Sequence, residues 1–352
     1  MADRKMTFGE KLRGIRILHR MTQEDLAKRV SLEKMSISKY ESGKMMPSSL
    51  TLVALCNVFE VSPDYFFRES TVNITATPEF RTLGNVKLAK TDQMRISQKT
   101  EEAMGNLLEI SGICAIARDF SQLESLRRTV RNSEDIEQLA MDVRDTWALG
   151  HDPIENLMEV AETNGFAIIL VDGPKKFDAA VFIDDTYGPI ISLKRDVPKN
   201  RQRFTLAHEL GHYFIRNSER NANMRWTPET RANRFAAALL VPRDDLIKDI
   251  GENRTNISSD ELCMLRDKYG ISIESLLVRM VSLGIISKQL KSRLEAYDIE
   301  TKSSEIEEPR LVRKLVNRAV SEGYISRRKG IDLLDGGYFG TSSLTCKNEV
   351  DS

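Results

Sequence analysis

The sequence predicts an α+β fold, mostly helical, with a helical N-terminal domain and a second domain built on a small sheet. Two observations carry this prediction. Residues 8–67 contain five short apolar patterns with helical spacing, separated by residues that end helices. From residue 165 onward, three short apolar runs precede a longer apolar helical pattern, which is the order expected of a small sheet followed by a helix that packs on it.

At 352 residues the chain is long enough for two or three domains. We predict a helical domain over residues 1–70, a connector and helical segment over 71–135, the sheet-containing domain over 136–290, and helices with a tail, disordered from about residue 341, over 291–352. No apolar run approaches the roughly 18 residues of a membrane span, and the polar start does not resemble a signal peptide. Four widely separated cysteines without paired spacing indicate free thiols, so we expect a cytoplasmic protein.

The N-terminal helices have recognisable ends. Thr22, followed three residues later by Asp25, is close to a capping box and predicts the start of a helix. In that helix the small side chain of Ala27 lets another helix cross closely. A short turn at Ser31 then leads to the next helix, expected over residues 33–40. The second and third helices therefore form a helix-turn-helix.

A helix-turn-helix places its second helix in the major groove of DNA, with the N-terminal residues of that helix at the base edges. Residues 1–70 hold 12 Lys and Arg against 9 Asp and Glu, a net charge of +3, within a chain of net charge +0. We therefore expect a double-stranded DNA operator as partner and, because such proteins usually bind paired half-sites, a homodimer. The alternative is a small helical interaction module that binds no DNA. The candidate DNA-contacting residues are Gln23, Lys34, Met35, Ser38, Lys39 and Lys44.

The run His208-Glu-Leu-Gly-His212 lies within the long apolar helical pattern. Two histidines four residues apart share one face of a helix, with Cβ atoms roughly 6 Å apart, so both imidazoles can reach one metal ion. Glu209 lies about 100° further around the helix, where its carboxylate can take a proton from metal-bound water. This pattern is typical of zinc metalloproteases. The alternative, a core helix whose histidines only form hydrogen bonds, leaves Glu209 unexplained.

Gly211, inside this run, is unusual because glycine costs a helix about 1 kcal/mol relative to alanine. Packing or a close backbone approach at this position would explain it.

A catalytic zinc ion needs a third protein ligand and an open position for water. Thr227 can cap a downstream helix, Pro228 suits its first position and Pro242 ends it. Glu229 then lies in the first turn, with Asn233 on the same face, where it can orient a ligated group. Glu229 could instead be an ordinary first-turn acid favoured by the helix dipole. The candidate Zn²⁺ ligands are His208, His212 and Glu229.

The three apolar runs before the metal helix predict strands over residues 165–171, 179–183 and 189–193. Asn200 is expected to cap the helix that carries His208. A small sheet followed by the metal helix is similar to the order of zincin-like proteases.

Two other segments have helical patterns. Residues 91–131 are expected to be helical and to couple the domains, to dimerise, or simply to pack. Residues 259–286 resemble a second helix-turn-helix around Gly270. Because Arg266 stands where Ala27 stands in the first one, we favour a helix pair packed on the second domain over a second DNA reader.

Residues 8–67 resemble the phage-repressor (Cro/repressor) helix-turn-helix family, which implies a five-helix, lambda-repressor-like domain. The matching residues are Thr22, Gln23, Glu24, Leu26, Ala27, Ile37, Ser38, Glu41, Gly43 and Pro47. Ser31 departs from this family, which usually has glycine in the turn. Because a serine at positive φ costs energy, we expect this turn to be strained or shifted.

Residues from about 140 to 290 resemble the ImmA/IrrE-type metallopeptidase family. The matching pieces are Trp147, Leu149, Gly150, Pro153, Ile154, and the runs 204–212 and 229–242. The resemblance implies that Glu229, in a Glu-x-x-Ala-Asn motif, supplies the third zinc ligand. It also implies that the substrate is a regulatory protein such as a transcriptional repressor.

Our leading hypothesis from the sequence is a DNA-binding transcription regulator with a zinc-dependent endopeptidase domain, in which Glu209 is the general base. One alternative is a regulator whose metal domain senses a ligand or partner without proteolysis. Another is the antitoxin of a toxin–antitoxin pair. Glu209 favours the enzyme, because a purely structural metal site has no use for a base beside it.

Overall fold

The computed structural model describes residues 7–19, 21–59, 63–67, 72, 74, 76–82, 87–216, 226–295 and 307–340. The predicted disordered tail and Cys346 lie outside these residues. The described cysteines, Cys56, Cys114 and Cys263, are free thiols, as predicted. No helix in the described part of the chain is both long enough and apolar enough to cross a membrane.

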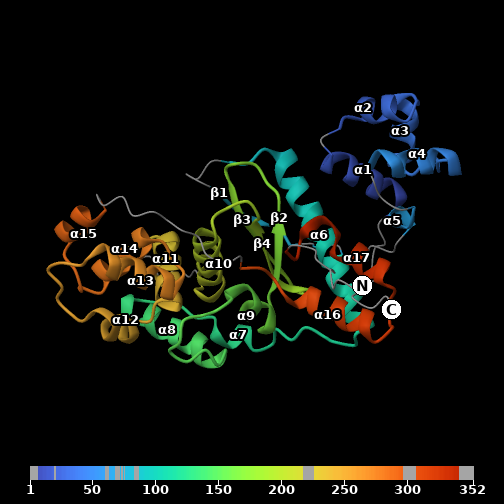
Figure 1. The fold of residues 1–352 in the computed structure, drawn as a ribbon. Helices are drawn as coiled ribbons and strands as arrows, with labels where there is room; N and C mark the ends of the chain where they lie inside the picture. The colour runs from blue at the N-terminus through green and yellow to red at the C-terminus, as the bar shows by residue number, and fades with distance from the viewer. Residues whose placement is uncertain are drawn as a thin grey trace, which may run out of the picture.

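Five helices form the N-terminal domain, as the sequence predicts (Figure 1). Their core contains fully buried Leu12, Leu26, Ile37 and Leu55. The helices are α1 (Phe8–Leu18), α2 (Gln23–Arg29), α3 (Lys34–Glu41), α4 (Ser49–Phe59) and α5 (Asp64–Phe67).

The turn between α2 and α3 has the strain that the sequence predicts. Ser31 has a φ of 56°, in the left-handed region where side chains other than glycine are disfavoured. Thr22 caps α2 through the expected capping box with Asp25. The start of α2 is therefore fixed by local contacts, whereas the start of α3, at Glu33, has no side-chain cap.

A four-stranded sheet lies at the centre of the second domain, in the order β1-β3-β4-β2. Strands β2 and β4 are parallel, and the other two pairings are antiparallel. The strands are β1 (Glu79–Thr82), β2 (Ala167–Val171), β3 (Phe177–Asp184) and β4 (Gly188–Lys194). The last three confirm the predicted strands. The edge strand β1 lies in the predicted connector and was not predicted, because four residues are too few to give a recognisable pattern.

Helices cover both faces of the sheet, and alternate strand residues enter two different cores (Figure 1). In β2, Ile168 and Leu170 face one core, whereas Ala167, Ile169 and Val171 face the other. The first core is formed with α8 (Ser133–Thr146), α9 (Leu157–Thr163), α10 (Lys199–Phe214) and α11 (Pro228–Leu240). The second is formed with α6 (Lys90–Ile113), α16 (Leu311–Ser321) and α17 (Arg327–Leu334).

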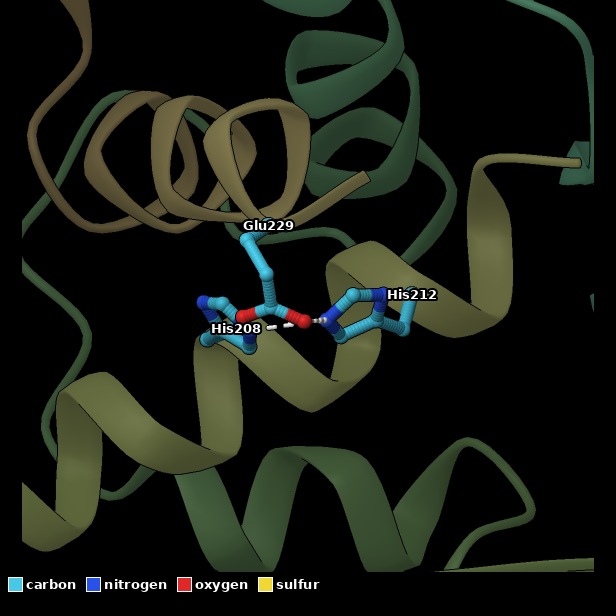
Figure 2. Close-up of side chains that lie close together, drawn as sticks. All are labelled: His208, His212 and Glu229. Carbon is cyan, nitrogen blue, oxygen red and sulfur yellow. Dashed lines mark hydrogen bonds and ion pairs between the residues drawn. The ribbon is translucent and has the colours of Figure 1, made fainter. Parts of the chain in front are cut away.

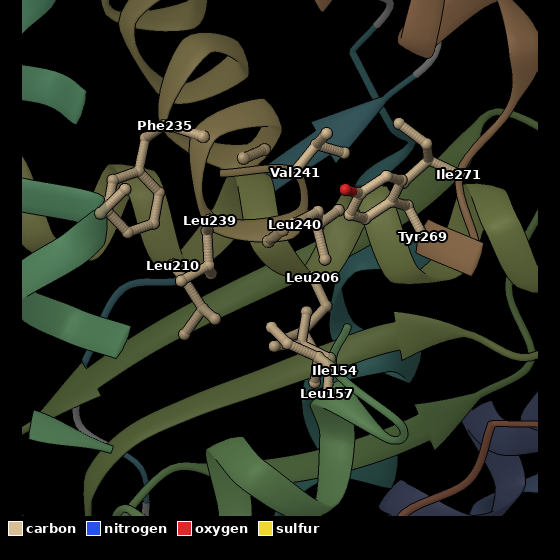
Figure 3. Packing of buried hydrophobic residues seen from close by; sticks show 14 of the residues in the cluster. Ile154, Leu157, Leu206, Leu210, Phe235, Leu239, Leu240, Val241, Tyr269 and Ile271 are labelled. Atoms are coloured by element: carbon tan, nitrogen blue, oxygen red, sulfur yellow. The ribbon is translucent and has the colours of Figure 1, made fainter. Parts of the chain in front are cut away.

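The first core fixes the two helices that matter most for function. Leu206 and Leu210 of α10 pack with Phe235 and Leu239 of α11, and all four are fully buried (Figure 3). The remaining helices on this side are α7 (Leu123–Leu126), α12 (Arg243–Ile250), α13 (Ser259–Tyr269), α14 (Ile273–Ser282) and α15 (Lys288–Leu294). Helices α13 and α14 bury Leu262 and Leu277 in this core, which confirms a packed helix pair.

Two boundaries differ from the sequence prediction. The helix expected over residues 91–131 ends at Ile113, because Ala115 adopts a left-handed φ of 53° that a helix cannot continue through. The helix with His208 begins at Lys199, after Pro198, and Asn200 does not cap it. Instead, Asn200 lies inside the first turn and accepts a bond from the backbone N–H of Arg201.

The C-terminal segment after residue 306 is anchored to the helices around α10. Glu307 accepts the backbone N–H of Leu157 at the start of α9 and pairs with Arg203 of α10 at 3.3 Å. Both side chains of this pair are at most 3% exposed. In return, Glu162 of α9 accepts the backbone N–H groups of Arg310 and Leu311, at the start of α16. The segment and α10 are therefore joined by buried charges.

Candidate functional site

Helix α10 presents both histidines toward α11. The four-residue spacing places His208 and His212 one above the other, with their Nε2 atoms 2.8 Å apart. His208 is fully buried, whereas the side chain of His212 remains 21% exposed. The site is therefore reachable from solvent past His212 and past Glu229, whose side chain is 54% exposed.

Helix α11 brings Glu229 to the two imidazoles. Thr227 caps this helix and Pro228 occupies its first turn, as predicted, so Glu229 projects from the first turn. Its carboxylate oxygens lie 3.2 Å from Nε2 of His208 and 3.2 Å from Nε2 of His212 (Figure 2). The three side chains predicted as ligands thus converge on one point.

Gly211 explains how the two helices come so close. A Cβ atom at this position would lie 3.0 Å from the Cα of Ala232 and 3.1 Å from the ring of Phe235. The backbone of α10 therefore approaches α11 at the level of the metal site, as the glycine in the motif suggested. Any larger residue would force the helix that carries Glu229 outward.

Asn233 contacts the buried histidine from behind. Its Oδ1 lies 2.6 Å from Nδ1 of His208. With that oxygen as acceptor, Nδ1 carries the proton and Nε2 presents a lone pair to the site. Burial and, to a smaller extent, the positive charge of Arg81 together lower the pKa of His208 to about 2. Burial also lowers the pKa of His212. Both imidazoles are therefore neutral at physiological pH, which is the form that binds metals.

The donor set fits a zinc ion. One ligand atom from each of His208, His212 and Glu229 lies within 4.8 Å of the others. Bonds of about 2.0–2.1 Å in a tetrahedron place ligand atoms about 3.3 Å apart, close to the two 3.2 Å separations here. Three protein ligands would leave the fourth position open, as in catalytic zinc sites.

Glu209 lies beside this cluster and is buried. Burial raises its pKa to about 7, and the neighbouring guanidinium of Arg81 opposes that rise. The contact between them joins Arg81 Nη1 to Glu209 Oε1 at 3.2 Å. Arg81 was not predicted as a site residue, because it lies in the short strand β1, 128 residues before its partner. Nothing in the local pattern of Glu79-Phe-Arg-Thr82 indicates that contact.

In the N-terminal domain, the predicted DNA-contacting residues surround α3. Lys34, Met35 and Lys39 are exposed, and Met35 exposes 63% of its surface. Ser38 is partly buried, and Lys44 is exposed after the end of α3. The predicted face of the motif helix is therefore accessible.

Gln23, the predicted phosphate contact, begins α2 and has an internal partner. Its Nε2 donates to Glu41 Oε2 at 2.7 Å, and Arg16 pairs with the same carboxylate. Gln23 is thus oriented by Glu41 before any DNA is bound.

Two family models match the chain. Residues 12–66 match the helix-turn-helix family, and residues 167–281 match a peptidase family described as the IrrE N-terminal-like domain. No curated protein matches the sequence.

Two solved structures are similar to parts or most of the chain. The DNA-binding domain of the P22 C2 repressor is 28% identical over 20% of this chain and 91% of its own, with a TM-score of 0.19. PlcR from Bacillus thuringiensis, solved with the peptide PapR7 and DNA, is 10% identical over 95% of this chain and 100% of its own, with a TM-score of 0.17. Neither TM-score indicates a shared overall fold, so the assignment of both domains rests on the family models.

Proposed function

Because residues 12–66 form a helix-turn-helix domain and residues 167–281 an IrrE N-terminal-like domain, we propose that this protein is a DNA-bound transcription regulator with a zinc-dependent endopeptidase activity. The observation that carries the proposal is the convergence of three ligand atoms beside a buried carboxylate that is not one of the ligands. A structural metal site would gain nothing from Glu209, whereas peptide hydrolysis needs a base there.

In the proposed mechanism, His208, His212 and Glu229 would hold a zinc ion, which would polarise the scissile carbonyl and lower the pKa of water toward ~7. Glu209 accepts a proton from the attacking water and delivers it to the nitrogen of the leaving amine. Asn233 keeps His208 in the tautomer whose Nε2 lone pair faces the site. Metal binding and proton transfer are therefore each assigned to side chains that lie at the site.

The helix-turn-helix would bring this activity to an operator or promoter. We propose that α3 enters the major groove, with Lys34, Met35, Ser38 and Lys39 near the bases, while Gln23 and Lys44 contact the backbone. A homodimer bound to paired half-sites is the usual arrangement of such helix-turn-helix domains, and we propose it here. The substrate we propose is a regulatory protein, with a transcriptional repressor as the first choice.

The proposal is tested by metal analysis and cleavage on the full chain. The zinc-loaded protein should cleave members of a quenched fluorescent peptide library, lose that activity with a chelator, and recover it with Zn²⁺. Glu229→Ala should bind zinc weakly and cleave nothing, whereas Glu274→Ala, an acid in the first turn of another helix, should behave as the unmodified protein.

Chelator-resistant zinc in Glu229→Ala would contradict the ligand assignment. An intact peptide library together with a metal-dependent change in operator binding would contradict proteolysis and support a sensing role for the same site.

A further inference from the structure

Strand β1 places one of its faces against the metal centre. Side chains alternate along a strand, so Glu79 and Arg81 share a face while Phe80 points the other way. Phe80 packs against the second core, on the far side of the sheet from α10. The charges of both Glu79 and Arg81 act on Glu209 and on His212. The strand that pairs with β3 at the sheet edge thus contributes polar groups to the candidate active site.

Arg81 makes a selective contact there. Its Nη1 lies 3.2 Å from Oε1 of Glu209, and the two side chains are 28% and 5% exposed. Within the part of the chain that the structure describes, its guanidinium forms no hydrogen bond or ion pair with His208, His212 or Glu229. The guanidinium of Arg81 therefore contacts one oxygen of the proposed base and, among the residues that the structure describes, bonds to none of the three proposed ligands.

We propose that Arg81 is a positioning residue for Glu209, supplied to the active site by a strand outside the segment that matches the peptidase family. This inference rests on the proposed function. The peptidase match begins at residue 167, whereas β1 follows the helix-turn-helix domain, whose match ends at residue 66. Strand β1, which lies outside both family matches, would then position Glu209, which lies inside the peptidase match.

The physical reason is the setting of Glu209. A carboxylate this deeply buried has few groups that can fix its rotation, and an unpaired buried charge is strongly disfavoured. A single guanidinium contact at Oε1 removes that freedom and directs the second oxygen. Catalytic groups that are misplaced by about 1 Å can lose on the order of 100-fold in rate, so such a clamp has a large effect.

A blocking role for the same arginine is the rival interpretation. A block would need Arg81 to cover the open side of the ligand cluster, whereas its described contact is with the base alone. The two interpretations predict opposite changes in the cleavage rate when Arg81 is removed. Removal of a positioning residue lowers the rate, and removal of a block raises it.

The experiment compares Arg81→Ala, Arg81→Lys and a matched control, Arg254→Ala. Arg254 is a similarly exposed arginine that pairs with a glutamate at 2.8 Å, far along the chain from the metal ligands. On one cleaved peptide, Arg81→Ala should lower kcat by about 10- to 100-fold with little change in KM. Millimolar guanidinium ion should restore part of the rate, and Arg81→Lys should retain part of it. The control should change neither value.

A second measurement does not depend on turnover. The positive charge of Arg81 acts against a cation held by His208 and His212, so Arg81→Ala should bind Zn²⁺ at least as tightly as the unmodified protein in competition with a chelator. A loss of rate with weaker zinc binding and no guanidinium rescue would mean a merely structural role, and would overturn the inference.

An unchanged or higher kcat in Arg81→Ala would also overturn it, in favour of no role or of a block. If the unmodified zinc-loaded protein cleaves nothing, the proposed function fails and the role of Arg81 fails with it. If that protein is active and Arg81→Ala is equally active, only the role of Arg81 fails.

Discussion

The two functional regions of this chain hold their side chains in different ways. At the candidate metal site, His208 is fully buried and hydrogen-bonded to Asn233, and Glu209 is buried against Arg81. On α3, the helix proposed to enter the major groove, Lys34 and Met35 are exposed to solvent. Buried polar groups must find partners within the fold, whereas exposed ones take their geometry from whatever binds them. The fold alone can therefore define the side-chain geometry of the candidate metal site. For the proposed DNA-contacting helix α3, it defines only which residues are exposed.

The largest effect is expected from the buried ion pair that supports α10. Glu307→Ala leaves Arg203 as a buried charge without its carboxylate and removes the acceptor at the start of α9. We expect a loss of about 3–5 kcal/mol in the free energy of unfolding, measured by urea titration. The contrast between buried and exposed charged groups would be contradicted if this loss of stability were no larger than the loss caused by Glu24→Ala in the N-terminal domain. There, Glu24→Ala breaks an exposed pair with Lys28 and should cost less than about 1 kcal/mol.

A smaller effect should follow from a methyl group between the site helices. Gly211→Ala places a Cβ about 3 Å from the backbone of Ala232, so α11 must shift. We expect about 1–3 kcal/mol of destabilisation by overpacking. Because the shift moves Glu229 away from the histidines, zinc binding should weaken as well. Gly105→Ala is the control, since a Cβ at that helical position meets no atom within 4 Å. Equal zinc affinity in both variants would contradict the close-approach account.

Exposed residues of the reader should affect binding without affecting folding. Lys44→Ala removes a proposed contact with the DNA backbone, so it should weaken binding to mixed-sequence duplex DNA and reduce the salt dependence of the binding constant by about 0.9. Lys39→Ala, at a position proposed to lie near the bases, should weaken operator binding more than it weakens binding to mixed-sequence DNA. The free energies of unfolding of both variants should stay within about 0.5 kcal/mol of the unmodified protein. Lys175→Ala, an exposed lysine of the second domain, should leave the salt dependence unchanged. An unchanged salt dependence in Lys44→Ala would exclude a phosphate contact by this lysine.

The smallest effect concerns the strained turn before α3. Ser31 adopts a φ of 56°, which glycine would adopt without penalty. Because glycine also gains freedom in the unfolded chain, we expect Ser31→Gly to stabilise the domain by no more than about 1 kcal/mol, measured by thermal unfolding. Ser31→Ala keeps the strain and should give no gain. A clear destabilisation by glycine would mean that the serine side chain contributes more than its strained backbone costs.

The sequence predicts well those features that depend on local contacts. The spacing of His208 and His212, the cap at Thr227 and the turn at Ser31 each involve neighbouring residues, and the structure places them as expected. The three buried strands were recognisable because each is bounded by turn residues. Even Gly211, an apparent defect in a helix, correctly indicated a close approach.

The features that the sequence does not predict depend either on contacts between residues far apart in the chain or on the residue at which a helix begins or ends. Arg81 meets Glu209 across 128 residues, and its strand of four residues is too short to give a pattern. Helix α6 ends at Ile113 because Ala115 adopts a left-handed conformation, which the sequence does not predict for an alanine. Asn200 was predicted as the cap from its side chain alone, but the cap is Pro198 and the helix begins two residues earlier than predicted. In each case tertiary contacts or backbone geometry overrule local preference.

The most direct test of the central claim is the cleavage rate of Glu209→Gln. The change keeps the shape of the side chain and leaves the proposed ligands intact, but removes the base. With the same zinc content as the unmodified protein, Glu209→Gln should cleave the chosen peptide about 10²- to 10⁴-fold more slowly. Cleavage at the unmodified rate by zinc-loaded Glu209→Gln would contradict the account.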